Sequence, residues 1–103
     1  MNKNPHAASY EDFLDDVLRD PKLAAGYLNE AINENDPILV LMALRNVARA
    51  HGIKSIAKAL HTQRENVSRM LSARGNPGLA NFLKILSAAG LVLQVKAKRA
   101  LAA

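Results

Sequence analysis

The stretch Ile53–Ser72, IKSIAKALHTQRENVSRMLS, decides the fold of this chain. Apolar residues at helical spacing form one stripe on each half of it: Ile56, Ala57 and Leu60 on the first half, and Val67, Met70 and Leu71 on the second. Two short amphipathic helices joined by a tight turn are typical of a helix-turn-helix, whose second helix enters the major groove of DNA. The alternative is an ordinary helical hairpin whose polar face is only solvated.

The second helix carries its own start signal. Thr62-Gln63-Arg64-Glu65 fits the capping-box pattern, in which a hydroxyl and a carboxylate bind the first free N–H groups of a helix. We therefore expect Thr62 or Gln63 to cap this helix, and Glu65 to be a capping residue rather than a reader of bases.

Composition indicates one folded domain of 103 residues. Half of the residues are apolar, which argues against a disordered chain, and there are no cysteines, which excludes disulfides and thiolate metal sites. No apolar run approaches the roughly 18 residues of a membrane span, and the N-terminus has no hydrophobic signal segment. We expect a soluble protein of the cytoplasm.

The net charge of +5 hides an asymmetry between the two parts of the chain. Residues 1–40 contain eight acids and three bases, a net charge of −5, whereas residues 41–103 contain one acid and eleven bases, a net charge of +10. A basic segment that coincides with a helix-turn-helix favours phosphate binding. The acidic segment would repel DNA, so we expect it to face away from DNA or to meet a basic partner.

Residues 1–8 show no periodicity and are expected to be a disordered terminus, and residues 9–36 are expected to form an acidic helical segment. Ser9 caps the first predicted helix, and Asp20-Pro21 starts the second, with Asp as the cap and Pro at the first helical position. The predicted apolar face of the first helix consists of Phe13, Leu14, Val17 and Leu18. Gly26 in the second helix costs about 1 kcal/mol of helix propensity, so we expect a close helix contact there.

Residues 37–90 are expected to form the DNA-binding core. Asp36-Pro37 repeats the start signal, and Ile38–Leu44 is apolar almost all round, which predicts a central helix buried on every side and ending at Gly52. Asn76-Pro77 starts the last helix of the core. The predicted apolar face of that helix consists of Leu79, Phe82, Leu83, Ile85 and Leu86.

Residues 91–96 change period. Leu91, Leu93 and Val95 alternate with Val92, Gln94 and Lys96, which predicts a short strand. Because one strand has no partner in a helical chain, we expect Leu91, Leu93 and Val95 to pair with a second copy in a dimer or with the sheet edge of another partner. The alternative is an extended tail lying on the core. Residues 97–103 are expected to be a flexible tail.

The order of these features from about residue 9 to residue 96 is specific. It consists of Asp20-Pro21, Tyr27–Ala31, Asp36-Pro37, Ala43–Gly52, Ile56-Ala57, Arg64–Val67, Gly75–Pro77 and Ala88–Leu93. In this order the chain resembles one branch of the Cro/CI-type (XRE-like) helix-turn-helix proteins, the probable addiction module antidote proteins. The resemblance implies an all-α fold, a Cro/CI-like helix-turn-helix bundle, here with two N-terminal helices and a short C-terminal strand.

The same resemblance implies a function. Such a protein is the antitoxin of a type II toxin–antitoxin module, which neutralises a RelE/ParE-like toxin by binding it and represses its own operon by binding operator DNA. The chain departs from the family pattern at three places. His61 stands where glycine is usual, but histidine tolerates the positive φ of the turn. Thr62 replaces an apolar residue, and the 91–96 strand replaces the fifth helix, which often forms the dimer.

If the second helix enters the major groove, its polar face is the candidate DNA-binding site. Side chains able to reach bases are Gln63, Arg64, Ser68, Arg69 and Ser72, and flanking residues suited to phosphate are Lys54, Lys58, Arg74 and Asn76. Arginine can bind guanine O6/N7 with two hydrogen bonds, and it can equally bind phosphate. One such domain makes a small interface, so we expect a homodimer on two half-sites about one helical turn apart.

The first helix is the candidate toxin-binding surface. It carries Glu11, Asp12, Asp15 and Asp16, and toxins of the RelE/ParE type tend to be basic. The alternative is that these acids form a solvated helix face.

No catalytic site is expected, because His6, His51 and His61 lack metal-ligand spacing and the chain has no Gly-rich phosphate loop. We therefore expect no enzyme activity, no metal, no cofactor and no small-molecule substrate. Two other functions stay open: a transcriptional regulator without a toxin, and a protein-binding inhibitor whose helix-turn-helix no longer binds DNA.

Overall fold

The computed structural model describes the backbone of residues 5–99 and the side chains of residues 10–99. Over this range the protein has six helices and no strand. The helices are α1 (Pro5–Leu18), α2 (Pro21–Asn33), α3 (Pro37–His51), α4 (Ile53–Ala59), α5 (Arg64–Met70) and α6 (Gly78–Ala88). The all-α class is therefore confirmed for the described residues.

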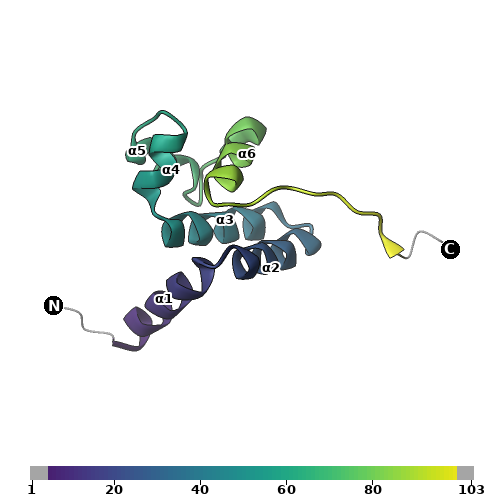
Figure 1. Ribbon diagram of the computed structural model, residues 1–103, viewed down its shortest axis with the longest axis horizontal. Coiled ribbons are helices and arrows are strands. Elements are labelled where there is room, and N and C mark those ends of the chain that lie inside the picture. Colours follow the sequence, from purple (N-terminus) through teal and green to yellow (C-terminus); the bar gives the residue numbers. More distant parts are fainter. Residues whose placement is uncertain (1–4, 100–103) are drawn as a thin grey trace.

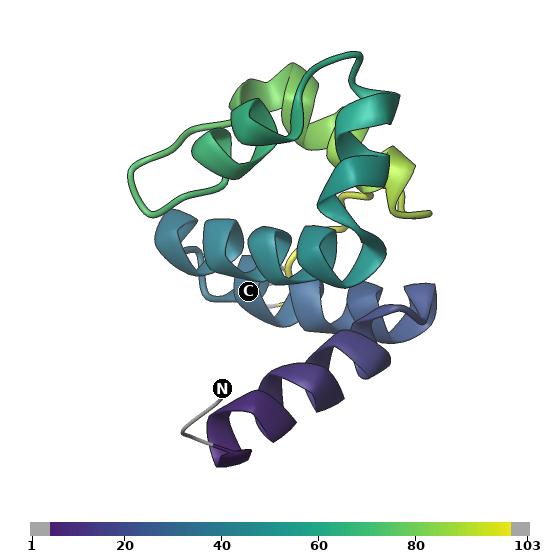
Figure 2. The ribbon, with the colours of Figure 1, turned by 90° about the vertical axis from the view of Figure 1, so that its left-hand side faces the viewer.

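Helix α3 lies at the centre of the fold. Helices α1 and α2 lie on one side of it, and α4, α5 and α6 lie on the other (Figures 1 and 2). One apolar core joins the two sides. Its largest fully buried side chains are Leu44, Ile56, Leu71, Ile85, Val47 and Val67. They come from α3, from α4, from α5 and the residue that follows it, and from α6.

The helix starts predicted from Asp-Pro pairs are confirmed. The side chain of Asp20 accepts a hydrogen bond from the backbone N–H of Lys22 at 2.9 Å, and the side chain of Asp36 accepts one from Ile38 at 2.9 Å. Asn76 accepts a hydrogen bond from the N–H of Gly78 at 3.1 Å in the same way, but α6 begins one residue later than predicted, at Gly78, with Pro77 in the cap position. In each case a short polar side chain binds an N–H group that has no partner within its helix.

The first helix begins earlier than predicted, at Pro5 and not at Ser9. Proline is favoured at the first helical position, because its fixed φ suits the helix and it has no N–H to satisfy. The expectation of disorder is therefore wrong for residues 5–8. Residues 1–4 lie outside the described range.

The turn before α5 forms as expected at His61, whose φ of 57° lies in the left-handed region. The capping box, however, is wrong. Helix α5 begins at Arg64 with Gln63 as its cap residue, and Gln63 makes no side-chain capping bond. The hydroxyl of Thr62 instead accepts a hydrogen bond from Asn66 Nδ2 at 2.8 Å.

The predicted C-terminal strand is wrong, because residues 91–98 have no regular secondary structure. A strand needs a neighbour to bind its N–H and C=O groups, and residues 5–99 supply none. Leu91 packs against the core, and its N–H donates to the carbonyl of Leu86 at 2.8 Å. Beyond Leu91 the side chains are exposed, and the segment runs away from α6 (Figure 1).

Several apolar side chains that were expected in the core are exposed. They are Phe13 on α1, Ile38, Leu39 and Met42 on α3, and Leu79 and Leu83 on α6. The prediction that Ile38–Leu44 is buried all round is therefore wrong. The two groups of helices cover two sides of α3, and the third side stays open over the first half of the helix.

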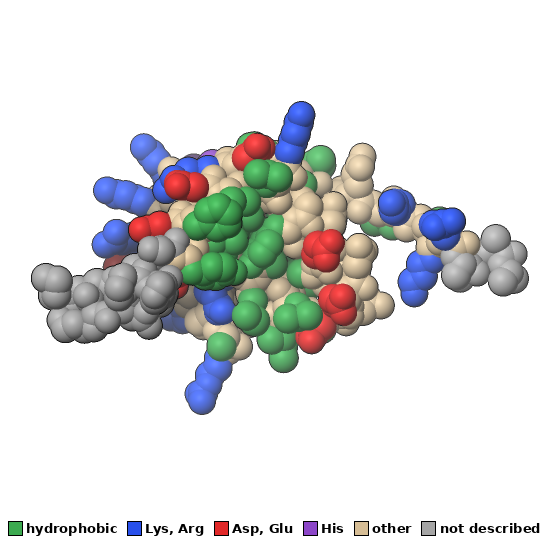
Figure 3. Space-filling model, turned by 90° about the horizontal axis from the view of Figure 1, so that it is seen from below, with side chains coloured by type: hydrophobic (Ala, Val, Ile, Leu, Met, Phe, Trp, Pro, Cys, Tyr) green, Lys and Arg blue, Asp and Glu red, His purple; other side chains and the backbone are tan. Residues whose placement is uncertain are grey.

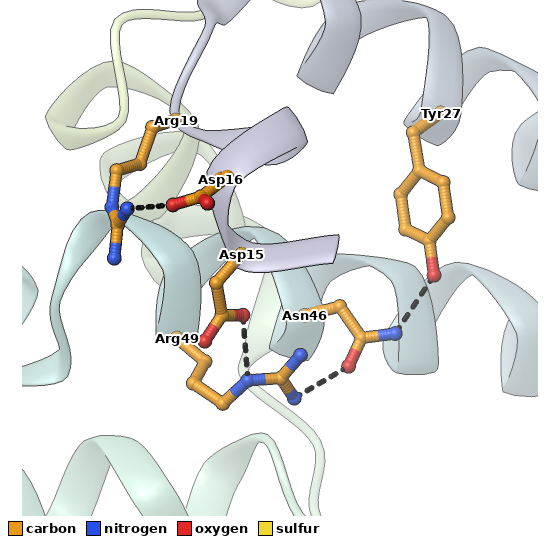
Figure 4. A network of polar contacts seen from close by, with 6 residues as sticks. All are labelled: Asp15, Asp16, Arg19, Tyr27, Asn46 and Arg49. Carbon is orange, nitrogen blue, oxygen red and sulfur yellow. Dashed lines mark hydrogen bonds and ion pairs between the residues drawn. The ribbon is translucent and has the colours of Figure 1, made fainter. Parts of the chain in front are cut away.

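A chain of polar contacts ties α1, α3 and α2 together (Figure 4). Asp15 on α1 accepts a hydrogen bond from Arg49 Nε on α3 at 3.0 Å, and Arg49 Nη1 donates to Asn46 Oδ1 at 2.8 Å. Asn46 Nδ2 in turn donates to the hydroxyl of Tyr27 on α2 at 2.8 Å. All these bonds are partly buried, so they fix how α1 and α2 sit on α3.

Two glycines give a test of the packing. The close contact expected at Gly26 is wrong, because a Cβ added there meets no atom within 4 Å. We predict that Gly26→Ala raises the free energy of unfolding by about 0.5–1 kcal/mol, since alanine has the better helix propensity and nothing must move. Urea denaturation followed by circular dichroism measures this change.

Gly75→Ala is the matched control. A Cβ at Gly75 would overlap the carbonyl oxygen of Met70, so we expect the free energy of unfolding to fall by about 1–3 kcal/mol. A destabilising Gly26→Ala, or a neutral Gly75→Ala, would contradict this description of the backbone.

Candidate nucleic-acid interface

Helix α5 has one buried side and one exposed side. Val67 and the following Leu71 are buried in the core, which fixes the rotation of α5 about its axis. The polar residues that the sequence assigned to its outer face are exposed: Gln63, Arg64, Ser68 and Arg69. The core therefore presents two arginines of a short helix to solvent.

Arg45 on α3 holds the C-terminal end of α5. Its Nη1 donates a partly buried hydrogen bond to the carbonyl of Leu71 at 3.0 Å, directly after the last residue of α5. A positive charge at this end of a helix binds carbonyls that have no partner within the helix and interacts favourably with the helix dipole. Sequence reasoning missed this role, since only the folded chain brings Arg45 to Leu71.

Asn66 orders the exposed side of α5. Its Nδ2 donates to Thr62, and its Oδ1 accepts a hydrogen bond from Arg69 Nη1 at 2.9 Å. A guanidinium has five N–H donors, so this bond orients Arg69 and leaves donors for a ligand. Asn66 is therefore a functional candidate that the sequence reasoning omitted, although its place on the polar face of the predicted helix was a usable signal.

A groove of about 590 Å³ opens beside α5, towards the start of α6. Its polar lining consists of Thr62, Asn66, Arg69, Arg74, Asn76 and Asn81. The fold thus brings three predicted residues together, Arg69, Arg74 and Asn76, and adds Asn81, for which the sequence gave no signal. Positively charged and amide side chains around an open groove suit an anionic backbone.

The other predicted DNA-binding residues differ in their surroundings. Lys54 and Lys58 are exposed on α4 and do not line the groove. Ser72 is half-buried, and its hydroxyl donates to the carbonyl of Arg69 at 2.8 Å. The geometry therefore gives Ser72 a role in ending α5.

The predicted toxin-binding acids of α1 do not share one environment. Glu11, Asp12 and Asp16 are exposed, and Asp16 pairs with Arg19. Asp15 is half-buried and bound to Arg49, so the expectation that it lies on the outer face of α1 is wrong. This acidic helix and the basic α5 lie on opposite sides of α3 (Figure 1).

Among the described residues, no group of three or more His, Cys, Asp or Glu side chains is arranged to hold a metal ion. Within the same range, every helix is too short or too polar to cross a membrane.

Comparison with known proteins adds the family. A family model described as "Probable addiction module antidote protein" matches residues 10–97. The chain belongs to this family. Membership of the antidote family implies a toxin partner of some kind.

A relative in Haemophilus influenzae, described as an uncharacterized protein, is 38% identical over 73 residues, which span 71% of this chain and 75% of that protein. No solved structure matches the chain. The match to the family model confirms the antidote family that the sequence resembles.

The Arg45 bond can be tested by Arg45→Met, which keeps most of the aliphatic stem but removes the donor to Leu71. We predict a loss of about 1–3 kcal/mol in the free energy of unfolding, because a partly buried carbonyl loses its charged partner. Hydrogen exchange of the α5 amides should quicken as well. Arg19→Met, at an exposed ion pair, is the control and should change stability by less than about 0.5 kcal/mol. Equal effects of the two substitutions would contradict the role given to Arg45.

Proposed function

We propose that the protein is the antitoxin of a type II toxin–antitoxin module. It binds and neutralises a RelE/ParE-like toxin in the cytoplasm, and it represses its own operon by binding operator DNA. In this proposal α4 and α5 form a Cro/CI-type helix-turn-helix, and α5 is the recognition helix. The observation that carries it is the outward polar face of α5, fixed by the buried Val67 and Leu71, in a chain of the antidote family.

In the proposed complex, α5 lies in the major groove. Arg64 and Arg69 bind guanine edges or phosphates, and Gln63 at the start of α5 binds adenine N6/N7. Arg69 is held by Asn66 before DNA arrives, which lowers the entropy lost on binding. A bidentate arginine–guanine pair contributes about 1–3 kcal/mol of discrimination against other bases.

Phosphate contacts come from the residues around α5. Lys54 and Lys58 extend from α4, and Arg74 lies at the groove between α5 and α6. These residues belong to the part of the chain with a net charge of +10. The acidic helix α1 and the neighbouring helix α2 lie beyond α3, which keeps the carboxylates on that side away from the duplex (Figure 1).

A homodimer completes the DNA-binding unit in this proposal, because two copies on two half-sites supply the affinity that one small interface lacks. Of the three residues expected to form the dimer, Leu91 packs against the core, so Leu93 and Val95 are the proposed dimer contacts. Val95 is fully solvated in the single chain, and Leu93 is exposed, so both are available to a second copy.

The toxin half of the proposal rests on the family and on charge. The exposed Glu11, Asp12 and Asp16 give α1 a negative surface suited to a basic toxin. Membership of the antidote family favours this function over a regulator that acts without a toxin.

The DNA half is tested by fluorescence anisotropy on labelled DNA from upstream of the gene. We predict that Arg64→Ala/Arg69→Ala weakens specific binding at least about 30-fold, which corresponds to the loss of two contacts of about 1 kcal/mol or more each. Affinity of the wild-type protein should also fall as the salt concentration rises, because phosphate binding releases counterions.

The matched control is Arg19→Ala/Lys22→Ala, which removes the same charge from the α1–α2 side of the protein. It should leave DNA affinity within about threefold of wild type, since these groups lie beyond α3 and salt screens them. Binding to scrambled DNA as tight as binding to the upstream DNA would overturn the operator assignment.

The proposed neutralisation of a toxin is tested by measuring the growth of bacterial cells in which the protein encoded by the adjoining gene is induced. We predict that co-expressed wild-type protein restores growth, and that Arg64→Ala/Arg69→Ala restores it equally while no longer repressing a promoter fusion. Lack of rescue by both proteins would leave a regulator without a toxin. Loss of rescue in the variant alone would contradict the separation of the two surfaces.

A further inference from the structure

Four large apolar side chains stay exposed on the side of the protein that faces away from α5. Tyr10 and Phe13 on α1 are 64% and 65% exposed, and Leu39 and Met42 on α3 are 39% and 44% exposed. We call these four residues the α1–α3 patch. Exposed aromatic and methionine side chains are enriched at protein interfaces, so the composition of the patch is typical of a protein-binding surface.

On α1, the patch lies beside the stripe that packs on α3. Leu14, Val17 and Leu18 form that stripe and contact the core. Tyr10 continues the stripe one turn before Leu14 and Phe13 lies on one flank of it, whereas Asp15 lies on the opposite flank and is bound to Arg49. The contact between Asp15 and Arg49 therefore turns the two aromatic residues away from the Arg49 side.

On α3, helical spacing places Leu39, Met42, Asn46 and Arg49 on one side. The C-terminal half of this stripe is covered, because Asn46 binds Tyr27 of α2 and Arg49 binds Asp15 of α1. Among the side chains of residues 10–99, none covers the N-terminal half in this way, and Leu39 and Met42 are exposed. Leu39 and Met42 therefore lie on the same side of α3 as the residues that contact α1 and α2.

The view of this face from below agrees with that placement. Hydrophobic side chains gather in its middle, acidic side chains lie on both sides of them, and Lys and Arg side chains project from the edges of the face (Figure 3). Exposed acids on α1 and α2 and in the turns that follow them are Glu11, Asp12, Asp16, Asp20, Glu30 and Glu34. Residues 10–40 hold eight acids against Arg19 and Lys22, a net charge of −6.

The negative charge around the α1–α3 patch indicates which kind of partner can bind to it. A second copy docked through the same patch would bring two acidic rims together, and like charges facing each other cost free energy. DNA is repelled for the same reason. A basic protein places positive charges against the rim and an apolar surface against the centre, the arrangement of a specific interface.

We infer that the α1–α3 patch is the docking surface for the toxin, with Tyr10 and Phe13 as apolar anchors and the surrounding acids as a rim. The inference rests on the proposed antitoxin function and assigns it a surface. The anchors set how slowly the complex dissociates, whereas the acids speed association and make it depend on salt.

The test uses biolayer interferometry with the purified protein of the adjoining gene as the probe. Tyr10→Ser/Phe13→Ser should weaken binding at least about 10-fold through faster dissociation. Met42→Gln, on the other helix, should weaken it about threefold or more. Glu11→Gln/Asp12→Asn should slow association and flatten its salt dependence, with dissociation nearly unchanged.

The matched control is Leu79→Ser/Val92→Ser, which removes two apolar side chains that are somewhat more exposed, at 70% and 81%, from α6 and the segment after it. It should change affinity less than about twofold. Wild-type binding with patch variants that behave like this control would overturn the inference and leave the antitoxin function intact.

Two further outcomes are distinct. If wild-type protein does not bind the probe at all, the toxin half of the proposed function and the patch assignment are both overturned. If sedimentation shows a dimer of the free protein that Tyr10→Ser/Phe13→Ser dissociates, a second copy covers the patch and the inference is overturned.

Discussion

The central helix α3 has to be covered on two sides at once, and the rest of the structure depends on this constraint. Its buried residues Ala43, Leu44, Val47, Ala48 and Ala50 span more than one face of the helix, so neither group of helices could shield them alone. Two arginines add specificity to the packing. Arg45 reaches the end of α5, and Arg49, one turn later, reaches Asp15 of α1. One helix therefore positions both exposed surfaces of the protein.

This arrangement separates opposite charges. The basic groups around α5 and the acidic groups of α1 and α2 would neutralise each other if they were adjacent, and neither surface would attract its own partner. Because the two surfaces lie on opposite sides of α3, each keeps the electrostatic potential of its own charges (Figure 1). A single domain is then suited to a polyanion on one side and to a basic protein on the other. Membership of the antidote family is consistent with a second binding surface, because it implies a toxin partner.

Local signals in the sequence predicted the helices well, and long-range contacts explain most of what was missed. Asp20 and Asp36 cap their helices as expected because each bond reaches only two residues along the chain. His61 accepts a positive φ for an equally local reason. The roles of Arg45 and Asp15 depend on partners 26 and 34 residues away, which no spacing rule reveals.

The exposed apolar residues were missed for a related reason. Periodicity shows that Phe13, Leu39 and Met42 are apolar, but only the placement of α1 and α2 decides whether anything covers them. The strand expected at residues 91–96 failed because alternation gives no information about a pairing partner. In the candidate DNA-binding site, Arg64 and Arg69 were predicted from the polar face of one helix, whereas Asn81 joins the groove only through folding.

The central claim is that two opposite surfaces bind two different partners, and backbone amide chemical-shift mapping tests it most directly. With operator DNA added to labelled protein, we predict shifts concentrated in residues 54–76. With the toxin added, we predict shifts concentrated in residues 10–17 and 38–43, with α5 nearly unchanged. Shifts by both partners in the same set of amides, or by DNA mainly in α1 and α2, would contradict the account.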